Sequence, residues 1–370
     1  MRLRGWCLWR GEPQADPTWV HGEWLVVGEG IHRVPPTTHP MDLEGWILPG
    51  LVDVHCHIGI GRHGAATRGE QEEQALADRD SGVLAVRDCG VPVDNTWIHS
   101  REDLPRLIRS GRHIARPRRY IRDLPREVEP ADLAAAVAEE ALRGDGWVKI
   151  VGDWIDRSRG VDSDLDPLWP RPALVDAVAA AHEHGARLSV HAFSHAALDD
   201  LLEAGVDGIE HASGMDPDQL DRAVEAGVYV TPTLMQIELF SDFAAQAGRK
   251  YPVYAATMSA MWRRRHDHAR MLFDSGVRIL PGTDSGGYQD HGSLPRELAM
   301  WSAIGVPSGR ILDLATWQAR DALGLPSLHE GARADLVVCR EDPRLDIGAL
   351  TRQVEVVLAG RHVTPGRPAT

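Results

Sequence analysis

The alternation of short β-branched runs with longer helical segments, from about Val52 to Leu325, most constrains how this chain folds. Such a rhythm is expected of repeated βα units, in which helices join parallel strands. The eight runs that predict strands cover residues 52–57, 83–88, 113–121, 147–152, 187–192, 207–212, 228–234 and 277–284. Eight units favour an α/β fold of the (β/α)8 TIM barrel type, whose active site lies at the C-terminal ends of the strands.

The segments between these runs, such as PADLAAAVAEEALRG, PALVDAVAAAHEHG and AALDDLLEAG, have helical patterns that end on glycine, as helices commonly do. The chain ends differ, since HGEWLVVGEGI near the start and ADLVVCR and QVEVVLAGRHV near the finish read as strands. We therefore predict a small β-sandwich domain formed by residues 1–50 plus 330–370, and a catalytic barrel domain over residues 51–329.

Composition restricts the partners of the chain. It has 370 residues, of which 43% are hydrophobic and 25% charged, as expected of a large globular protein. Its formal net charge of -14 argues against a nucleic-acid partner, because such partners are attracted by clustered basic residues. The basic runs at residues 116–119 and 263–265 are interpreted as solvated positions. We expect a small-molecule substrate, and the sequence leaves a homo-oligomer open.

Neither a signal peptide nor a membrane span is expected, because the N-terminal MRLRGWCLWRGEPQ lacks an apolar run and no later segment is long and apolar enough. The four cysteines, Cys7, Cys56, Cys89 and Cys339, are scattered without metal-binding spacing. In a chain of this length they favour reduced thiols over a disulfide framework. We therefore predict a cytoplasmic protein with no membrane partner.

The strongest local signal is LPGLVDVHCHIG, in which His55 and His57 are two positions apart on an apolar strand. Residues two apart point to the same face of a strand, so the two imidazoles can share one metal ion while Cys56 points away. Taken alone, the pair also fits two polar residues at the end of a strand.

Lys149 lies in WVKIVG between Val148 and Ile150, where a charged ammonium is costly unless it is compensated. Desolvation favours the neutral amine, which can react with carbon dioxide to form a carbamate that bridges two metal ions. A lysine held in a salt bridge at the barrel rim is the alternative interpretation.

Three further residues end predicted strands: His191 in LSVHAF, His211 in GIEHAS and Asp284 in ILPGTDSGG. The fifth and sixth strands are neighbours in a barrel, which would bring the two histidines side by side. The eighth strand of a closed barrel lies beside the first, so Asp284 is expected near His55 and His57, where it can serve as both ligand and base.

The ordered set His-x-His, Lys, His, His, Asp at strands one, four, five, six and eight resembles the amidohydrolase superfamily. The flanking segments LPGLVDVHCH, ALADRDSGVLAVRDCG and GARADLVV are similar to those of the same superfamily. The resemblance implies six metal ligands, with one ion held by His55, His57 and Asp284, the second by His191 and His211, and a carbamylated Lys149 bridging them. Zinc is the first expectation for both ions, with iron, manganese or cobalt as alternatives.

Within the superfamily, IEHASG, TPTL and GTDSGG, followed by His291 and Glu297, resemble the imidazolonepropionase-related group, which includes Xaa-Pro dipeptidases. Lys149 favours the dipeptidase-like branch, because imidazolonepropionases and many deaminases use one metal ion and lack this lysine. Phe193 departs from that branch, whose members often have His-Ala-His-Gly where this chain has His-Ala-Phe-Ser. The departure argues against assigning a dipeptide substrate from the branch alone.

Residues that follow predicted strands are weaker candidates for substrate binding, since loops at this end of a barrel often contact substrate. They are Trp154 with its neighbour Asp153, Gln236 and His291, and, with the least support, Arg62 and His63. A tryptophan on a loop often serves packing, and a lone histidine is often solvated.

The predicted reaction is hydrolysis of an amide-type carbon–nitrogen bond of a small molecule by a hydroxide that bridges two divalent ions. Asp284 would accept the proton of the attacking water and deliver it to the leaving nitrogen. A mononuclear deaminase or cyclic-amide hydrolase, with Lys149 only structural, is the alternative, and a lactonase or organophosphate hydrolase remains open. A catalytically silent scaffold would lack ligands, whereas this set is complete.

Overall fold

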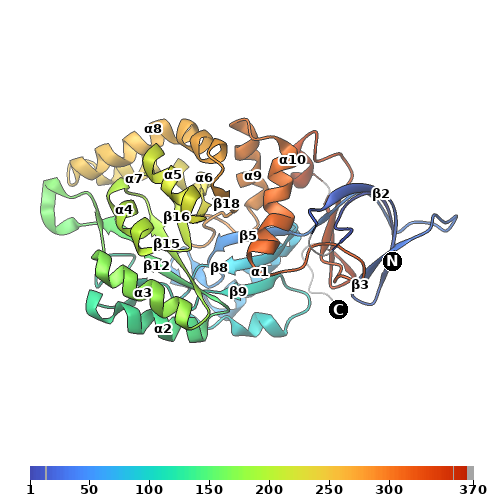
Figure 1. Cartoon of the computed structure of the whole chain (residues 1–370), viewed down its shortest axis with the longest axis horizontal. Helices are drawn as coiled ribbons and strands as arrows, with labels where there is room; N and C mark the ends of the chain where they lie inside the picture. Colours follow the sequence, from blue (N-terminus) through green and yellow to red (C-terminus); the bar gives the residue numbers. More distant parts are fainter. Residues whose placement is uncertain (13–14, 353, 365–370) are drawn as a thin grey trace.

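The computed structural model describes residues 1–12, 15–352 and 354–364 of the chain. Strands from the two ends of the chain pair into one seven-stranded sheet, the lobe at the right of Figure 1. In sheet order these strands are β21 (Arg361–Val363), β20 (Val354–Leu358), β19 (Leu336–Cys339), β4 (Leu43–Pro49), β1 (Arg2–Trp9), β2 (Thr18–Val27) and β3 (Gly30–Val34). The two chain ends therefore share one sheet, as their strand-like pieces predicted. Of the range predicted for this domain, residues 13–14, 353 and 365–370 lie outside the described part.

This sheet curls around its own apolar core. Trp24, Ile31 and Leu336 from three different strands are completely buried in it. The edge strand β3 is also bonded to the segment that precedes β19, since Ile31 N donates to Ala332 O at 2.9 Å. This bond covers part of an edge that would otherwise expose unpaired backbone groups.

The middle of the chain forms two sheets of parallel strands. The first contains β5 (Leu51–Cys56), β8 (Val83–Asp88) and β9 (Arg106–Arg109). The second contains β11 (Arg126–Glu127), β10 (Ile114–Ala115), β12 (Trp147–Val151), β15 (Arg187–Ala192), β16 (Gly208–His211), β17 (Tyr229–Thr231) and β18 (Arg278–Ile279). Almost every residue of these strands is buried, as is usual for parallel strands with covered faces.

The segment after β18 lies beside β5, so the last strand region of this part is adjacent to the first. Val54 N donates to Pro281 O at 2.8 Å, and Asp284 N donates to His55 O at 2.7 Å. The approach is close, because a Cβ on Gly282 would lie 2.5 Å from the Cβ of His55. Glycine at this position therefore permits the contact between the two segments.

The predicted bounds of two strands are wrong. Of the run 113–121, only Ile114–Ala115 forms a strand, and β9 takes the place beside β8 instead. The rest of the run turns, because Pro117 has no N–H for a ladder and Arg118 has a φ of 59°. The run 277–284 is likewise a strand only at Arg278–Ile279.

Helices cover the outer faces of the parallel strands (Figure 1). They are α1 (Arg68–Asp80), α2 (Leu133–Arg143), α3 (Arg171–Glu183), α4 (His195–Ala204), α5 (Pro217–Ala226), α6 (Leu234–Glu238), α7 (Phe240–Ala247), α8 (Pro252–Asp274), α9 (Leu294–Ala303), α10 (Ser308–Asp313) and α11 (Ala319–Ala322). The predicted glycine stop is observed after α4, where Gly205 has a φ of 79°. A capping box of Asp216 and Gln219 begins α5. Local residues of the sequence thus end α4 and begin α5.

Among the described residues, none of the helices combines the length and the apolar character needed to cross a lipid bilayer. The four cysteines are free and buried, as their scattered positions predicted. A short antiparallel hairpin, β13 (Asp153–Ile155) with β14 (Leu165–Pro167), follows β12 and carries Trp154. The two-residue strands β6 (Ile60–Gly61) and β7 (Gly64–Ala65) form a similar hairpin after β5.

Candidate metal centre

His55 and His57, at the end of β5, meet the carboxylate of Asp284. The Nε2 atom of His55 lies 3.1 Å from Asp284 Oδ1, and the Nε2 atom of His57 lies 3.3 Å from the same oxygen. The two histidines are two positions apart, so the alternation of the strand turns both rings to one side. The fold thereby brings two imidazoles together with one carboxylate that lies more than 200 positions later in the sequence.

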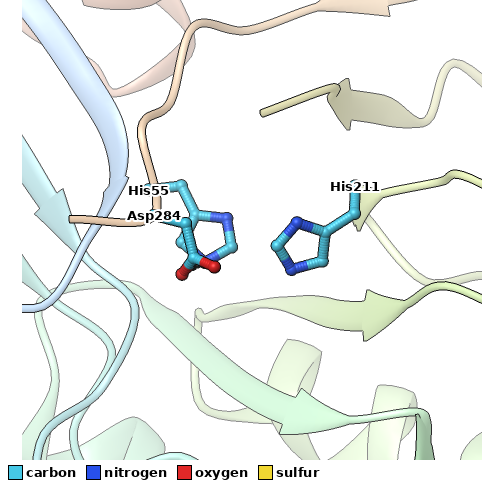
Figure 2. A group of neighbouring side chains, drawn as sticks. All are labelled: His55, His211 and Asp284. Atoms are coloured by element: carbon cyan, nitrogen blue, oxygen red, sulfur yellow. Dashed lines mark ion pairs between the residues drawn. The ribbon is translucent and has the colours of Figure 1, made fainter. Parts of the chain in front are cut away.

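His211, at the end of β16, faces this group from the other side. Figure 2 shows its ring directed toward His55 and Asp284. Potential ligand atoms of these three residues all lie within 4.8 Å of one another. The ring of His191, at the end of β15, lies 4.7 Å from the ring of His211, centroid to centroid. Histidines from adjacent strands therefore extend the cluster, as the sequence predicted.

Two of these side chains depend on unusual backbone geometry. His211 has a φ of 69° and Asp284 a φ of 58°, the left-handed region that non-glycine residues rarely occupy. Both residues lie where a strand ends and the chain turns. Left-handed residues of this kind cluster at functional sites, where the surrounding fold holds them.

Two of the histidines, His191 and His211, are in the protonation state that a metal ion needs. Burial lowers the pKa of His191 and of His211 well below the usual value, so both rings are neutral at physiological pH. The Nδ1 atom of His57 donates to Gly90 O at 3.0 Å, which leaves Nε2 with its lone pair for the cluster. The Nε2 atom of His191 is buried and has no hydrogen-bond partner among the described residues.

Lys149 lies in the middle of β12, and its side chain is 4% exposed. Its Nζ atom has no hydrogen bond to the described part of the chain. The nearest carboxylate in an ion pair is that of Glu210, whose Oε1 lies 3.9 Å from Nζ. A buried amine without a hydrogen bond is expensive, so this position fits an amine that carries a further group. The donor set of neutral imidazoles, carboxylate and buried amine suits divalent ions of the zinc type.

Comparison with known proteins assigns the chain to a family. The model of the amidohydrolase family matches residues 46–363. The chain belongs to the amidohydrolase family. An uncharacterized protein from Mycobacterium tuberculosis is 46% identical over 322 residues, which cover 87% of this chain and 86% of that protein. An uncharacterized protein from Mycobacterium bovis gives the same values.

Solved structures with the same fold include a Xaa-Pro dipeptidase with methionine in its active site, with a TM-score of 0.77 and 22% identity. That match covers 98% of this chain and 99% of the other. An ochratoxinase from A. niger matches with a TM-score of 0.78 and 17% identity, over 98% and 95% of the two chains. At identities this low the likeness establishes the fold, which is that of the branch indicated by the sequence.

This amidohydrolase has a buried carboxylate beside its histidines that the sequence analysis missed. Glu210 lies one residue before His211 on β16, and its Oε2 is 3.0 Å from His55 Nδ1. Its other oxygen lies 2.5 Å from Nη2 of Arg87. Strand alternation would assign Glu210 and His211 to opposite faces, but the left-handed φ of His211 turns both toward the cluster.

Aromatic rings surround the second pair of histidines. Trp154, one of the predicted substrate contacts, lies 5.7 Å from the ring of His191 and 4.5 Å from that of Tyr120. Phe193 packs against His211 at 4.7 Å and against Phe240 at the same distance. This side of the cluster is therefore largely apolar.

His113 is a further residue that the sequence analysis missed, because the run 113–121 read as a strand. Its Nδ1 donates to Gly90 O at 2.9 Å, the same carbonyl that His57 uses. Burial lowers its pKa to about 3, so its ring stays neutral. Its Nε2 is buried and has no hydrogen bond among the described residues, and its ring lies 6.0 Å from that of His57.

The other two predicted substrate contacts are His291 and Gln236. His291 was expected at the pocket mouth, but its Nδ1 lies 2.8 Å from Asp78 Oδ2 on α1, on the side of β5 to which Cys56 points. The carboxylate of Asp78 holds the His291 ring at this position and also accepts a hydrogen bond from Gly292 N. Gln236 lies on α6, and its buried Oε1 has no hydrogen bond within the described ranges.

Proposed function

We propose that this amidohydrolase hydrolyses an amide-type carbon–nitrogen bond of a small molecule at a centre of two divalent ions. The observation that carries the proposal is the buried Nζ of Lys149, which has no hydrogen bond among the described residues and lies near the neutral histidines His191 and His211. Such an amine fits reaction with carbon dioxide, which gives an anionic carbamate able to bridge two ions.

The use of lysine at this position is itself informative. The chain has only two lysines, and the other, Lys250, is exposed. Arginine supplies nearly all other positive charges of the chain, including the buried Arg87. A purely structural ion pair here could use arginine as well, whereas a carbamate requires a primary amine.

The proposed ligands divide into two groups. His55, His57 and Asp284 would hold one ion, His191 and His211 would hold the second, and carbamylated Lys149 would bridge them. The ions, zinc first and iron, manganese or cobalt as alternatives, would supply a water that loses its proton near neutral pH and would polarise the scissile carbonyl.

The chain itself would manage the proton. Asp284 is the only carboxylate among the described residues that contacts the Nε2 atoms of both His55 and His57. Its oxygens would accept the proton from the attacking water and then give it to the leaving nitrogen, so that one carboxylate acts as base and then as acid. Trp154 would contact the substrate on the side of His191.

We also propose that the parallel strands close into a (β/α)8 barrel and that the seven-stranded sheet folds over as a β-sandwich, with the two domains over residues 51–329 and over residues 1–50 plus 330–370. The bonds from Val54 and Asp284 across to the neighbouring segments support closure of the barrel. The position of His57, His191 and His211 at strand ends agrees with where such barrels bind substrate.

A mononuclear deaminase or cyclic-amide hydrolase is the second candidate. It is favoured by the 3.9 Å ion pair between Lys149 and Glu210, which would suffice for a structural lysine. The number of metal ions bound by the chain distinguishes the two candidates.

The test begins with metal analysis of protein produced with zinc, manganese or cobalt, together with ¹³C NMR after exposure to labelled carbon dioxide. Two ions per chain and one carbamate resonance that is lost in Lys149→Met are expected. One ion and no carbamate would overturn the binuclear proposal. Hydrolysis of a panel of N-acyl amino acids, dipeptides and cyclic amides, with and without a chelator, then identifies the substrate class.

A further inference from the structure

Glu210 is the most enclosed carboxylate near the candidate ligands, with a side chain that is 1% exposed. A buried carboxylate of this kind is costly unless cations or polar N–H groups surround it. Glu210 has three such partners from three different strands, namely His55 on β5, Arg87 on β8 and Lys149 on β12. Its side chain therefore contacts both His55, a proposed ligand of the first ion, and Lys149, the proposed bridging residue.

Arg87 holds Glu210 in place. Its Nη2 atom lies 2.5 Å from Glu210 Oε1, and its Nε donates to Val54 O at 2.7 Å, one residue before His55. Its guanidinium lies 4.3 Å from the ring centroid of Trp147, which packs against it. A guanidinium with this many fixed contacts leaves the carboxylate little freedom to move.

Glu210 also acts on the orientation of His55. Its Oε2 lies 3.0 Å from Nδ1 of His55, an electrostatic contact and not a well-aligned hydrogen bond. A carboxylate at this distance favours the proton on Nδ1, which leaves the lone pair on Nε2, the nitrogen that faces Asp284. Carboxylates that contact the far nitrogen of a histidine in this way orient the ring for metal binding.

The charges around Glu210 allow for a change at Lys149. Arg87 and Glu210 form a pair without net charge, and Lys149 lies farther off at 3.9 Å. If Lys149 becomes an anionic carbamate, Glu210 exchanges a cationic neighbour for an anionic one but keeps Arg87, and the proposed metal ions would offset the charge of the carbamate. The pair can therefore remain satisfied in both forms of the lysine.

We propose that Glu210, braced by Arg87, is a positioning residue that fixes the metal-binding nitrogen of His55 and links it to Lys149. The inference rests on the proposed function, since it concerns the same metal centre. Glu210 touches neither substrate nor reacting atoms and acts through His55.

The test is metal retention by Glu210→Gln, with Glu297→Gln as the matched control. Glu297 is also completely buried, but its oxygens accept from the backbone of Leu234 and Met235 on α6 and contact no proposed ligand. We expect Glu210→Gln to lose zinc to a competing chelator at about 10–100-fold lower chelator concentration than the wild type, a range typical for such partners of metal-binding histidines. Glu297→Gln should retain zinc as the wild type does, whatever its stability.

A second variant covers the case in which Glu210→Gln does not fold, as judged by circular dichroism. Glu210→Asp keeps the charge but shortens the side chain, so it should lose zinc at a chelator concentration between those of wild type and Glu210→Gln. Folded variants that both retain zinc like the wild type overturn the positioning role alone. A wild-type chain that binds no metal overturns the proposed function as well.

Discussion

The ring of Phe193 lies 4.3 Å from the ring of His191, centroid to centroid, in an edge-to-face arrangement. It occupies the position where relatives in the dipeptidase-like branch often have a second histidine. The same ring also packs on His211 and Phe240, so it supports both proposed ligands of the second ion. An apolar side chain here stiffens the ligands without adding a hydrogen-bond donor for substrate.

Replacing Phe193 with alanine should therefore affect stability and metal binding together. A buried phenylalanine exchanged for alanine typically costs about 3–5 kcal/mol in the free energy of unfolding, which urea denaturation measures. We also expect the second ion to be lost first on dialysis, because His191 and His211 gain freedom. The control is Phe243→Ala, which removes a half-buried ring beyond Phe240 and should leave metal content unchanged. Equal metal loss in both variants would contradict this role of Phe193.

The dependence of the second ion on Lys149 gives a direct prediction. Lys149→Met retains the volume of the side chain but cannot form a carbamate, so the variant should bind one ion where the wild type binds two. Plasma emission spectroscopy measures the metal content, and intact-protein mass under non-denaturing conditions should show the loss of one carbon dioxide. Lys250→Met, at the only other lysine, is the matched control and should behave as the wild type. Two ions bound by Lys149→Met would rule out the bridging role.

The sequence predicted the residues whose placement follows simple periodicity. His55 and His57 share a face because they are two apart on a strand, and His191 and His211 meet because their strands pair in parallel. Glu210 could not be found in this way, because the left-handed backbone of its neighbour His211 interrupts the alternation of side chains between the two faces of the strand. Local backbone conformation of this kind is set by tertiary contacts, which a strand pattern does not contain.

The prediction of the third strand was wrong for a different reason. The hydrophobic signal of β9 is only Arg106–Arg109, too short to stand out, whereas residues 113–121 offered a longer run with Tyr120 and Ile121. The segment that forms the strand is the one that pairs with β8, and the length of a hydrophobic run in the sequence does not decide it. The error also concealed His113, whose ring lies 6.0 Å from that of His57 and whose Nε2 has no hydrogen bond among the described residues.

Asp284→Asn should separate proton transfer from metal binding. Asparagine keeps an oxygen for the ion but accepts a proton poorly, so kcat should fall about 10²–10⁴-fold while the metal content is retained. Asp290→Asn is the control on the same loop, since the exposed Asp290 pairs with the exposed Arg62 and, among the described residues, with no proposed metal ligand. Turnover is measured on the best substrate of the panel, with metal analysis of the same samples. Unchanged turnover in Asp284→Asn with two bound ions would refute the proton role.

His268, a buried histidine on α8, predicts a pH dependence of stability. Burial, reinforced by the neighbouring Arg264, lowers the pKa of His268 to about 4, from an ordinary value of 6.5. A base whose folded pKa is depressed stabilises the protein above its unfolded pKa, and that stability is lost as the pH falls from 6.5 toward 4. Linkage gives a loss of about 2 kcal/mol by pH 5 from this group alone.

His268→Gln should remove this contribution, because the glutamine amide can still donate to Met215 O, as His268 Nε2 does at 3.0 Å, without titrating. The measurement is the free energy of unfolding in urea at pH values from 7.5 to about 5 in the presence of a chelator, since metal binding to other histidines is itself pH-dependent. Wild type should lose more stability than the variant over this range. His266→Gln, two residues away on α8 but half exposed, is the control and should follow the wild type. Parallel curves for wild type and His268→Gln would mean that the folded and unfolded states bind protons equally at His268.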